Sequence, residues 1–329
     1  MTLCAYLLPL RRTQFLANEA AEWASYFESL SKAGCEVVII DGSPPGVFSH
    51  HAKVFGTTHS HIQVDRRFSY LNDKVNAVHT GVAFTDNEKI ILADDDIRYT
   101  AENIRETVEL LERYEVVRPQ NFLSPLPWWA RIEAARMLIN RGVLRTADYP
   151  GTCGFRRSTM LRVGHYDGDV LFDNEEIIRH FAEKGATIAY ATDLFIRKRP
   201  PHFRKWMEQR ARQAYEDFGL RLKTSLFVSL PPLLLAVTLL FGLRGLVAYL
   251  IALALVSVGV ALRGWIRGRA KEVTPLSCCV FAPIWVLERS ISTYAAIYWY
   301  LARGGYPFGD RLLSKGIGRS WHKAAVQPR

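Results

Sequence analysis

The chain has 329 residues, of which 49% are hydrophobic and 12% aromatic, and its 42 Lys and Arg against 32 Asp and Glu give a formal net charge of +10. This composition excludes disordered, collagen-like and low-complexity chains, and the length suggests roughly two domains. The five cysteines are an odd number without zinc-binding spacing. They argue against a disulfide scaffold and a structural zinc site, and they fit a reducing compartment.

Short apolar runs alternate with helix-like stretches through the first part of the chain. The runs that read as buried strands cover residues 4–10, 35–43, 61–65 and 89–96, and the helix-like stretches cover 18–33, 73–85 and 101–114. The alternation predicts an α/β fold with a doubly wound sheet, in which ligands bind beyond the carboxyl ends of the strands. Neither GxGxxG nor GxxxxGK[ST] occurs, which argues against dinucleotide and Walker-type phosphate sites.

Three consecutive aspartates, Asp94, Asp95 and Asp96, come directly after an apolar run. Adjacent carboxylates repel one another unless a cation or protons neutralise them. Oxygen ligands of this kind suit Mg²⁺ or Mn²⁺ shared with a substrate diphosphate. An acidic turn that caps the next helix is the alternative interpretation. A buried strand would hold the carboxylates rigidly, which favours the metal interpretation.

A second acidic cluster, Asp173 to Glu176, follows a short apolar run and precedes a helix-like stretch. A carboxylate in this place could act as a general base. The same residues are also ordinary at a helix start, where acidic side chains cap the first turn. Between these two clusters, residues 118–138 begin rich in Pro and Trp and continue as a helix.

Residues 197–223 form a basic, aromatic-rich segment with nine Lys and Arg and three acids. Such a segment favours a helix that lies on anionic lipid, and it would also suit nucleic acid. Strongly apolar sequence follows immediately, so lipid head groups are the nearer anion. We therefore expect membrane lipids as partners and no nucleic acid.

Two long apolar runs, 225–243 and 246–262, are each about long enough to cross a ~30 Å hydrocarbon layer. Because only a few residues connect the two runs, they predict an antiparallel transmembrane hairpin. The alternative is a pair of buried core helices. A third apolar stretch, 276–302, is interrupted by Glu288 and Arg289. It would be a third span with its charges facing protein, or a re-entrant or interfacial segment.

The distribution of basic residues predicts how the chain lies in a membrane. Lys and Arg gather in 197–223, 263–271 and the tail from 303 onward, and all three blocks should prefer the cytoplasm. Two spans followed by a re-entrant segment satisfy this rule. Residues 1–12 lack the pattern of an export signal. We therefore predict a multi-pass protein of the inner (cytoplasmic) membrane whose large N-terminal domain faces the cytoplasm.

The order of these features resembles the family 2 glycosyltransferases, and within them bacterial enzymes similar to ceramide glucosyltransferase. The resemblance rests on Pro9 at the end of the first strand, Asp41 in VVIIDGS, Lys74 before a helix, the Asp-x-Asp in ILADDDIRY, the acidic cluster at 173–176 and the QxxR run at 209–212 ahead of membrane helices. It implies the GT-A fold, with a mixed α/β sheet followed by C-terminal transmembrane or interfacial helices. The implied domains are a cytoplasmic domain at 1–223, in which 197–223 is interfacial, a hairpin at 224–263, and a third apolar segment with a basic tail at 264–329.

The resemblance also implies a role for each matching residue. Asp94 and Asp96 would bind Mg²⁺ or Mn²⁺. The donor-binding residues would be Pro9, Asp41, Lys74, Asp95, Gln209, Arg210 and Arg212, with Asp41 near the nucleotide base and Lys74 near the phosphates. Asp173, Glu175 and Glu176 stand where the family has its catalytic base, and we favour Asp173, then Glu176.

Two departures from the family pattern limit this reading. The sequence has no literal Glu-Asp pair in the base motif, and Gln213 stands where the QxxRW motif has its tryptophan. That tryptophan often contributes to the acceptor site of processive synthases, so its absence argues against polymerisation.

The resemblance implies a metal-assisted, inverting transfer of sugar from a nucleotide donor, UDP-linked rather than GDP-linked, to a lipid or glycan acceptor. Two alternatives stay open: a subunit of a processive polysaccharide synthase, and a non-catalytic membrane anchor that binds nucleotide sugar. The sugar and the acceptor are not readable from these residues.

Overall fold

A computed structural model describes residues 2–56, 58–148, 150–217, 221–309 and 311–316 of the chain. The described residues form two compact units. The first, here called the sheet unit, comprises Met1–Asn121 and Tyr149–Arg197, and the second, the helical unit, comprises Phe122–Asp148 and Lys198–Ile317. Most of the basic tail predicted from residue 303 onward lies outside the described residues.

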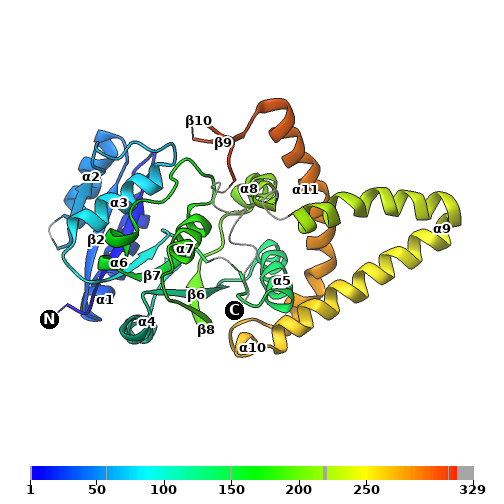
Figure 1. The fold of residues 1–329 in the computed structure, drawn as a ribbon, viewed down its shortest axis with the longest axis horizontal. Helices are drawn as coiled ribbons and strands as arrows, with labels where there is room; N and C mark the ends of the chain where they lie inside the picture. Colours follow the sequence, from blue (N-terminus) through cyan, green and yellow to red (C-terminus); the bar gives the residue numbers. More distant parts are fainter. Residues whose placement is uncertain (1, 57, 149, 218–220, 310, 317–329) are drawn as a thin grey trace. The chain divides into compact units, whose positions relative to one another are not determined.

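The first part of the sheet unit alternates strands and helices as the sequence predicts (Figure 1). Its elements are β1 (Cys4–Leu10), α1 (Ala17–Lys32), β2 (Cys35–Asp41), α2 (Pro45–Phe55), β3 (Ser60–Gln63), α3 (Asp73–Phe84) and β4 (Lys89–Ala93). These strands pair in parallel, β3 with β2, β2 with β1, and β1 with β4. Their carboxyl ends therefore lie along one edge of the sheet, where ligands bind in such folds.

The second part of the sheet unit makes the sheet mixed. It contains β5 (Ile97–Arg98), α4 (Ala101–Arg113), β6 (Val116–Leu123), β7 (Thr152–Arg156), α6 (Arg157–Val163), α7 (Asp173–Glu183) and β8 (Ile188–Lys198). The strand order is β3-β2-β1-β4-β7-β6-β8-β5, and β7 runs antiparallel to β4 and β6. The predicted α/β fold with a doubly wound mixed sheet is confirmed. β6 occupies a stretch in which the sequence predicted only the helix that follows it.

Two apolar layers, one on each face of the sheet, hold the strands in place. Tyr6 and Leu8 of β1 pack into the layer with α1, α2 and α4, whereas Leu7 packs into the layer with α3 and α7. This alternation follows from the two-residue period of a strand. Gly81 lets α3 approach closely, because a Cβ there would lie 2.9 Å from the Ile40 side chain. α3 thereby brings its first turn to the carboxyl edge of the sheet.

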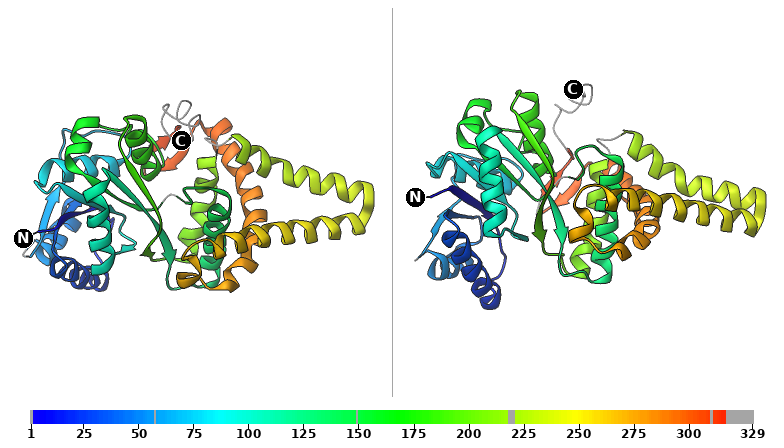
Figure 2. Two further views of the ribbon diagram at one scale, coloured as in Figure 1. Left: turned by 60° about the horizontal axis from the view of Figure 1, so that its bottom comes forward. Right: turned by 90° about the horizontal axis from the view of Figure 1, so that it is seen from below.

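The helical unit contains a long apolar helix bent back on itself. Its elements are α5 (Trp128–Val143), α8 (Phe203–Glu216), α9 (Arg221–Ile266), α10 (Ala270–Val273), the 3-10 segment η2 (Leu276–Phe281), α11 (Ala282–Arg303) and the strands β9 (Tyr306–Phe308) and β10 (Arg311–Leu313). Gly242 interrupts α9 with φ 61° and ψ −149°, a conformation that favours glycine. The two arms of α9 run side by side from this point (Figure 2), and the Tyr249 hydroxyl donates to the Leu230 carbonyl across them.

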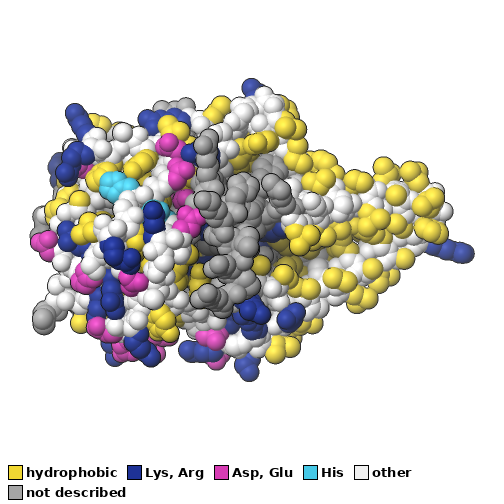
Figure 3. All heavy atoms as spheres, viewed as in Figure 1, with side chains coloured by type: hydrophobic (Ala, Val, Ile, Leu, Met, Phe, Trp, Pro, Cys, Tyr) yellow, Lys and Arg dark blue, Asp and Glu magenta, His cyan; other side chains and the backbone are white. Residues whose placement is uncertain are grey.

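The arms of α9 expose apolar side chains instead of burying them. Leu222–Ile266 is the one helix of the described residues that is long and apolar enough to cross a membrane, and its most apolar window is 17% buried. Leu239, Leu240 and Leu255 are each at least 70% exposed, and Figure 3 shows apolar side chains covering this part of the molecule. A core helix of a soluble protein would hide these groups.

The units do not follow the domain boundary that the sequence suggests at residue 223. α5 packs in the helical unit, where Ile132 shares an apolar cluster with Trp206, Phe227 and Trp285. α5 also approaches α9 closely, because a Cβ on Gly264 would lie 1.9 Å from the Leu138 carbonyl oxygen. A change of composition along the chain cannot reveal such contacts, since α5 and α9 are far apart in sequence.

The third apolar stretch divides into η2 and α11, and its two charged residues face other parts of the helical unit. Arg289 Nη1 lies 3.6 Å from Asp217 Oδ2, and Glu288 Oε2 lies 3.9 Å from Arg210 Nη1. Both side chains are thus directed at protein charges, which lowers the cost of placing them in apolar surroundings.

Candidate active site

Four polar side chains meet at the carboxyl edge of the sheet, and we call them the Lys74 cluster: Lys74, Asp94, Asp173 and Asn174. Lys74 Nζ lies 2.5 Å from Asp94 Oδ1 and 2.7 Å from Asp173 Oδ2, and it donates to Asn174 Oδ1 at 2.8 Å. The Asn174 amide closes the ring by donating to Asp94 Oδ2 at 3.1 Å. Residues about a hundred positions apart are thus brought into one constellation.

Local structure explains how each member reaches the cluster. Asn72 caps α3 by accepting the Lys74 backbone N–H, which fixes the helix start beside the sheet. Asp94 follows β4 directly, and its backbone N–H donates to the Gly151 carbonyl at 2.8 Å. Asp173 is the first residue of α7. Three separate elements therefore hold the four side chains.

The charges of the cluster stabilise one another and stay within reach of a ligand. Burial alone would lower the pKa of Lys74, but the Asp173 and Asp94 carboxylates outweigh it and raise that pKa above its ordinary value. The Lys74 side chain is 20% exposed, Asp94 22% and Asp173 9%. A protonated amine held between two carboxylates at a partly open strand end can exchange one of them for an incoming anion such as phosphate.

The three candidates for the catalytic base occupy different surroundings. Asp173, Glu175 and Glu176 all lie in the first turn of α7 and are all buried. Glu175 pairs with Arg179 four residues along the same helix. Asp173 contacts the Lys74 ammonium at 2.7 Å and so belongs to the Lys74 cluster. A place in the first turn of a helix is thus compatible with the predicted role as a base, which stays a prediction.

Arg12, which the sequence did not suggest as a site residue, sits beside the aspartate triplet. Its Nη2 lies 2.6 Å from Asp95 Oδ2 and 2.7 Å from Glu19 Oε1, and its guanidinium lies 4.8 Å from the centre of the Trp23 ring. Burial alone would lower the pKa of Arg12, but Glu19 and Asp95 raise it. Its position just after β1 was the one available signal, because β1 ends at the same edge of the sheet as β4.

The aspartate triplet has the ligand type that Mg²⁺ and Mn²⁺ prefer. Asp94 to Asp96 are hard oxygen donors, all partly accessible, on a turn held by β4 and by the hydrogen bond from the Ile97 N–H to the Asp94 carbonyl. Lys74 and Arg12 already face Asp94 and Asp95. The three aspartates therefore fit a divalent ion. The ammonium group of Lys74 and the guanidinium group of Arg12 add positive charge at the same place.

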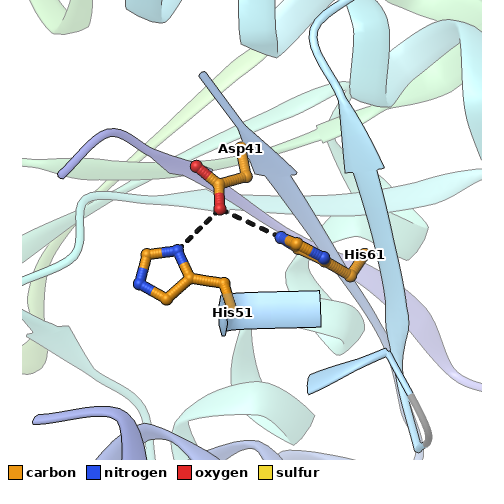
Figure 4. A group of neighbouring side chains, drawn as sticks. All are labelled: Asp41, His51 and His61. Atoms are coloured by element: carbon orange, nitrogen blue, oxygen red, sulfur yellow. Dashed lines mark hydrogen bonds and ion pairs between the residues drawn. The ribbon is translucent and has the colours of Figure 1, made fainter. Parts of the chain in front are cut away.

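Asp41 lies at the end of β2 as predicted, but its side chain is buried and hydrogen-bonded to other residues of the chain. The Ser43 backbone N–H donates to Oδ1 at 2.8 Å, while His51 Nδ1 and His61 Nε2 lie 2.7 Å and 3.0 Å from Oδ2 (Figure 4). Burial would raise the pKa of Asp41, but these hydrogen bonds lower it to about 2. Pro9 pairs with Ile40 in the neighbouring strand and is partly buried.

The remaining predicted donor residues, Gln209, Arg210 and Arg212, lie on α8 in the helical unit. Arg210 is 5% exposed; its Nη1 donates to Glu133 Oε2 at 2.9 Å and its guanidinium lies over the Trp206 ring. The Arg212 guanidinium lies 5.2 Å from the centre of the Phe308 ring. Arg210 would have to leave Glu133 to contact a donor.

No family model matches the chain, and no curated protein matches it. Similar solved structures include the mannosyltransferase PcManGT from Pyrobaculum calidifontis in complex with GDP-Man and Mn²⁺, with 16% identity, a TM-score of 0.49, and coverage of 88% of this chain and 86% of that one. Another is glucosyl-3-phosphoglycerate synthase from Mycobacterium tuberculosis with Mn²⁺ and UDP-glucose, with 16% identity, a TM-score of 0.43, and coverage of 64% and 76%. At these values the matches assign no substrate or reaction to this chain.

Proposed function

We propose that this chain is a membrane-bound inverting glycosyltransferase that moves a sugar from a nucleotide diphosphate to a lipid acceptor. The observation that carries the proposal is the Lys74 cluster, in which the two acidic segments picked out from the sequence meet around one ammonium group. Group transfer from a diphosphate needs a cation for the leaving phosphate and a carboxylate for the acceptor proton, and this cluster contains both.

The transfer requires one bond exchange at the anomeric carbon. The acceptor hydroxyl oxygen bonds to that carbon, the carbon–oxygen bond to the diphosphate breaks, and the nucleoside diphosphate leaves with the bonding electron pair. Asp173 takes the hydroxyl proton, a contribution of about 10²–10⁴-fold in such reactions. We propose that Lys74 turns from Asp173 toward the donor phosphate, which leaves the carboxylate available to the acceptor. Glu176 is the second choice for the base.

The other donor contacts follow from the positions along the sheet edge. Asp94 and Asp96 would hold Mg²⁺ or Mn²⁺, which when bound offsets negative charge on the diphosphate. Arg12 and Asp95 sit beside them, and Arg suits phosphate because it can donate two parallel hydrogen bonds. Asp41 and Pro9 would border the base, a uracil by the family resemblance. Asp41 would have to give up a histidine to contact it directly.

The membrane part of the proposal rests on the exposed arms of α9. Leu239, Leu240 and Leu255 would face lipid, the two arms would each cross the bilayer, and α8 would lie at its surface. We propose the cytoplasmic membrane as the location, with residues 1–223 on the cytoplasmic side and 264–329 returning there. A chain anchored in this way would have membrane lipids, with their hydroxyl and phosphate groups, available as acceptors.

The proposal is tested by incubating the purified full chain in detergent with native lipid extract, Mg²⁺ or Mn²⁺ and a panel of nucleotide sugars. Mass spectrometry of the organic phase should show one hexose added to one lipid class. Polymer in place of a single addition would favour the processive synthase. Nucleotide binding without turnover by any donor would favour the non-catalytic anchor.

One variant pair makes the test specific to the site. Asp96→Asn should abolish transfer and metal dependence, whereas Asp86→Asn, which changes an exposed acid outside the site, should leave both intact. Both proteins should give the circular dichroism spectrum of the wild type. Wild-type turnover in the Asp96 variant would refute the proposed metal role.

A further inference from the structure

Three side chains from three elements converge beneath the carboxyl end of β2, and we call them the Asp41 cluster: Asp41, His51 of α2 and His61 of β3. Each offers one ligand atom, and these atoms all lie within 4.8 Å of one another. In Figure 4 both imidazole rings point a nitrogen at the same carboxylate oxygen, His51 from the side of the helix and His61 from the neighbouring strand.

Aromatic packing fixes both rings in this orientation. Phe48 stacks on His61 with ring centres 4.3 Å apart, and Phe55 stacks on His51 at 5.5 Å. The side chains of His51, His61 and Asp41 are 3%, 1% and 0% exposed. The three ligand atoms are therefore arranged before any ion binds, in a shell that excludes water.

The buried carboxylate of Asp41 requires positive charge nearby. Among the described residues its ion-pair partners are His51 and His61, and neither Lys nor Arg takes part. A carboxylate removed from water is costly unless it is paired or coordinates a metal. Hydrogen bonds from Ser43, His51 and His61 already support this charge, and a bound cation would support it further.

We propose that Asp41, His51 and His61 bind a divalent transition-metal ion of the Zn²⁺ type. Two imidazoles and one carboxylate form a ligand set that suits Zn²⁺, whereas the all-carboxylate turn at Asp94–Asp96 suits Mg²⁺ or Mn²⁺. The ion ties β2, α2 and β3 together under the sheet edge and is structural. This site is separate from the metal of the transfer reaction and does not depend on that reaction.

The test uses glutamine variants, because they separate metal binding from hydrogen bonding. In His51→Gln and His61→Gln the amide can still donate to Asp41, but it is a poor ligand for Zn²⁺. The full chain in detergent is stripped with a chelator, dialysed against ZnCl₂ and analysed for metal by mass spectrometry. We expect about one Zn²⁺ per wild-type chain and at least tenfold weaker binding in either variant.

Two controls identify the site, and one spectrum identifies the geometry. His59→Gln changes a neighbouring histidine outside the cluster, and an Asp94→Asn, Asp96→Asn double variant removes the acidic turn; both should keep the Zn²⁺. Co²⁺ added to the stripped wild-type chain should give the visible absorption of an ion bound by nitrogen and oxygen ligands of the cluster, absent from the His51 and His61 variants. Zn²⁺ should raise the melting temperature of the wild type and not of these variants.

The proposal fails under either of two results. A wild-type chain that retains no more Zn²⁺ than His51→Gln shows that the cluster is only hydrogen-bonded. Loss of Zn²⁺ in the Asp94, Asp96 double variant, with retention in His51→Gln, places the ion at the acidic turn instead. Since no readout involves sugar transfer, the zinc result and the transfer result are obtained independently, and Asp41 is the residue that both proposals share.

Discussion

The sheet unit and the helical unit differ in the kind of side chain that they expose. The sheet unit buries Leu7 and keeps Lys74 and Asp94 of its central cluster partly exposed. The helical unit buries Arg210, which pairs with Glu133, and exposes Leu239. A protein in water hides apolar groups, and a protein in lipid must shield its charges. The contrast is the one that the proposed membrane location of the helical unit would require, and each prediction below tests one side of it.

The largest expected effect concerns the proposed catalytic base of the sheet unit. Asp173→Asn removes the proposed base while keeping a side chain of the same shape beside Lys74, so transfer should fall by about 10²–10⁴-fold. Steady-state kinetics with the lipid acceptor measures this loss. Folding should hardly change, because the asparagine oxygen can still accept from Lys74. Asp86→Asn provides the exposed control, and an Asp173 variant that turns over normally would transfer the role to Glu176.

The buried charges of the helical unit should instead govern stability. Glu133 faces both Arg136 at 2.7 Å and Arg210 at 2.9 Å. Burial would raise the pKa of Glu133, but the two guanidinium groups hold it well below its ordinary value. Glu133→Gln leaves the buried guanidinium group of Arg210 without the negative charge of Glu133. The change should lower the unfolding free energy by about 3–5 kcal/mol. Denaturant unfolding in detergent measures this cost.

The control for Glu133 is an exposed pair in the same unit. Arg269 Nε lies 2.9 Å from Glu272 Oε2, and both side chains are about half exposed. Glu272→Gln should cost less than about 1 kcal/mol, because water screens such pairs. Equal costs for the two variants would show that the buried pair contributes no more to the unfolding free energy than a surface pair. The electrostatic part of the comparison between the units would then be contradicted.

The apolar half of the comparison is tested by shortening one leucine in each unit. Leu7 is 0% exposed in the sheet, so Leu7→Ala should destabilise by about 2–5 kcal/mol through lost burial and a cavity. Leu239 is 76% exposed, and Leu239→Ala should change the unfolding free energy by less than about 0.5 kcal/mol. A large cost at Leu239 would mean that the arms of α9 pack against protein, as in a second copy of the chain.

How far the sequence predicts this molecule depends on the range of the interactions involved. The strands β1 and β2 and the helices α3 and α4 follow from local apolar patterns and end close to the predicted residues. Gly242 interrupts α9 near the end of the first predicted apolar run, next to the expected turn. Each of these features is encoded within one stretch of chain, so periodicity and turn chemistry suffice.

The site was accessible from sequence only in part. The sequence indicates Asp94 as an acid at a strand end and Asp173 as an acid at a helix start. The family resemblance links both residues to Lys74. The contacts of Arg12 with Asp95 and of Asn174 with Asp94 span long loops of chain, and no spacing rule reveals them. The same holds for His51 and His61, which meet Asp41 only because α2 and β3 pack beside β2.

The last prediction concerns Asp41, a buried charge of the sheet unit. Its pKa is lowered from 3.8 to about 2, so the folded state holds the carboxylate more firmly ionised than the unfolded chain does. The resulting stability is present above about pH 4 and is lost as the pH falls toward 2, and it amounts to roughly 2 kcal/mol. Urea unfolding of the chelator-treated protein between about pH 5 and pH 2 should show this slope, and Asp41→Asn should remove it. The same slope in both proteins would show that other carboxylates, such as the buried Glu175 and Glu176, carry the acid sensitivity of the sheet unit.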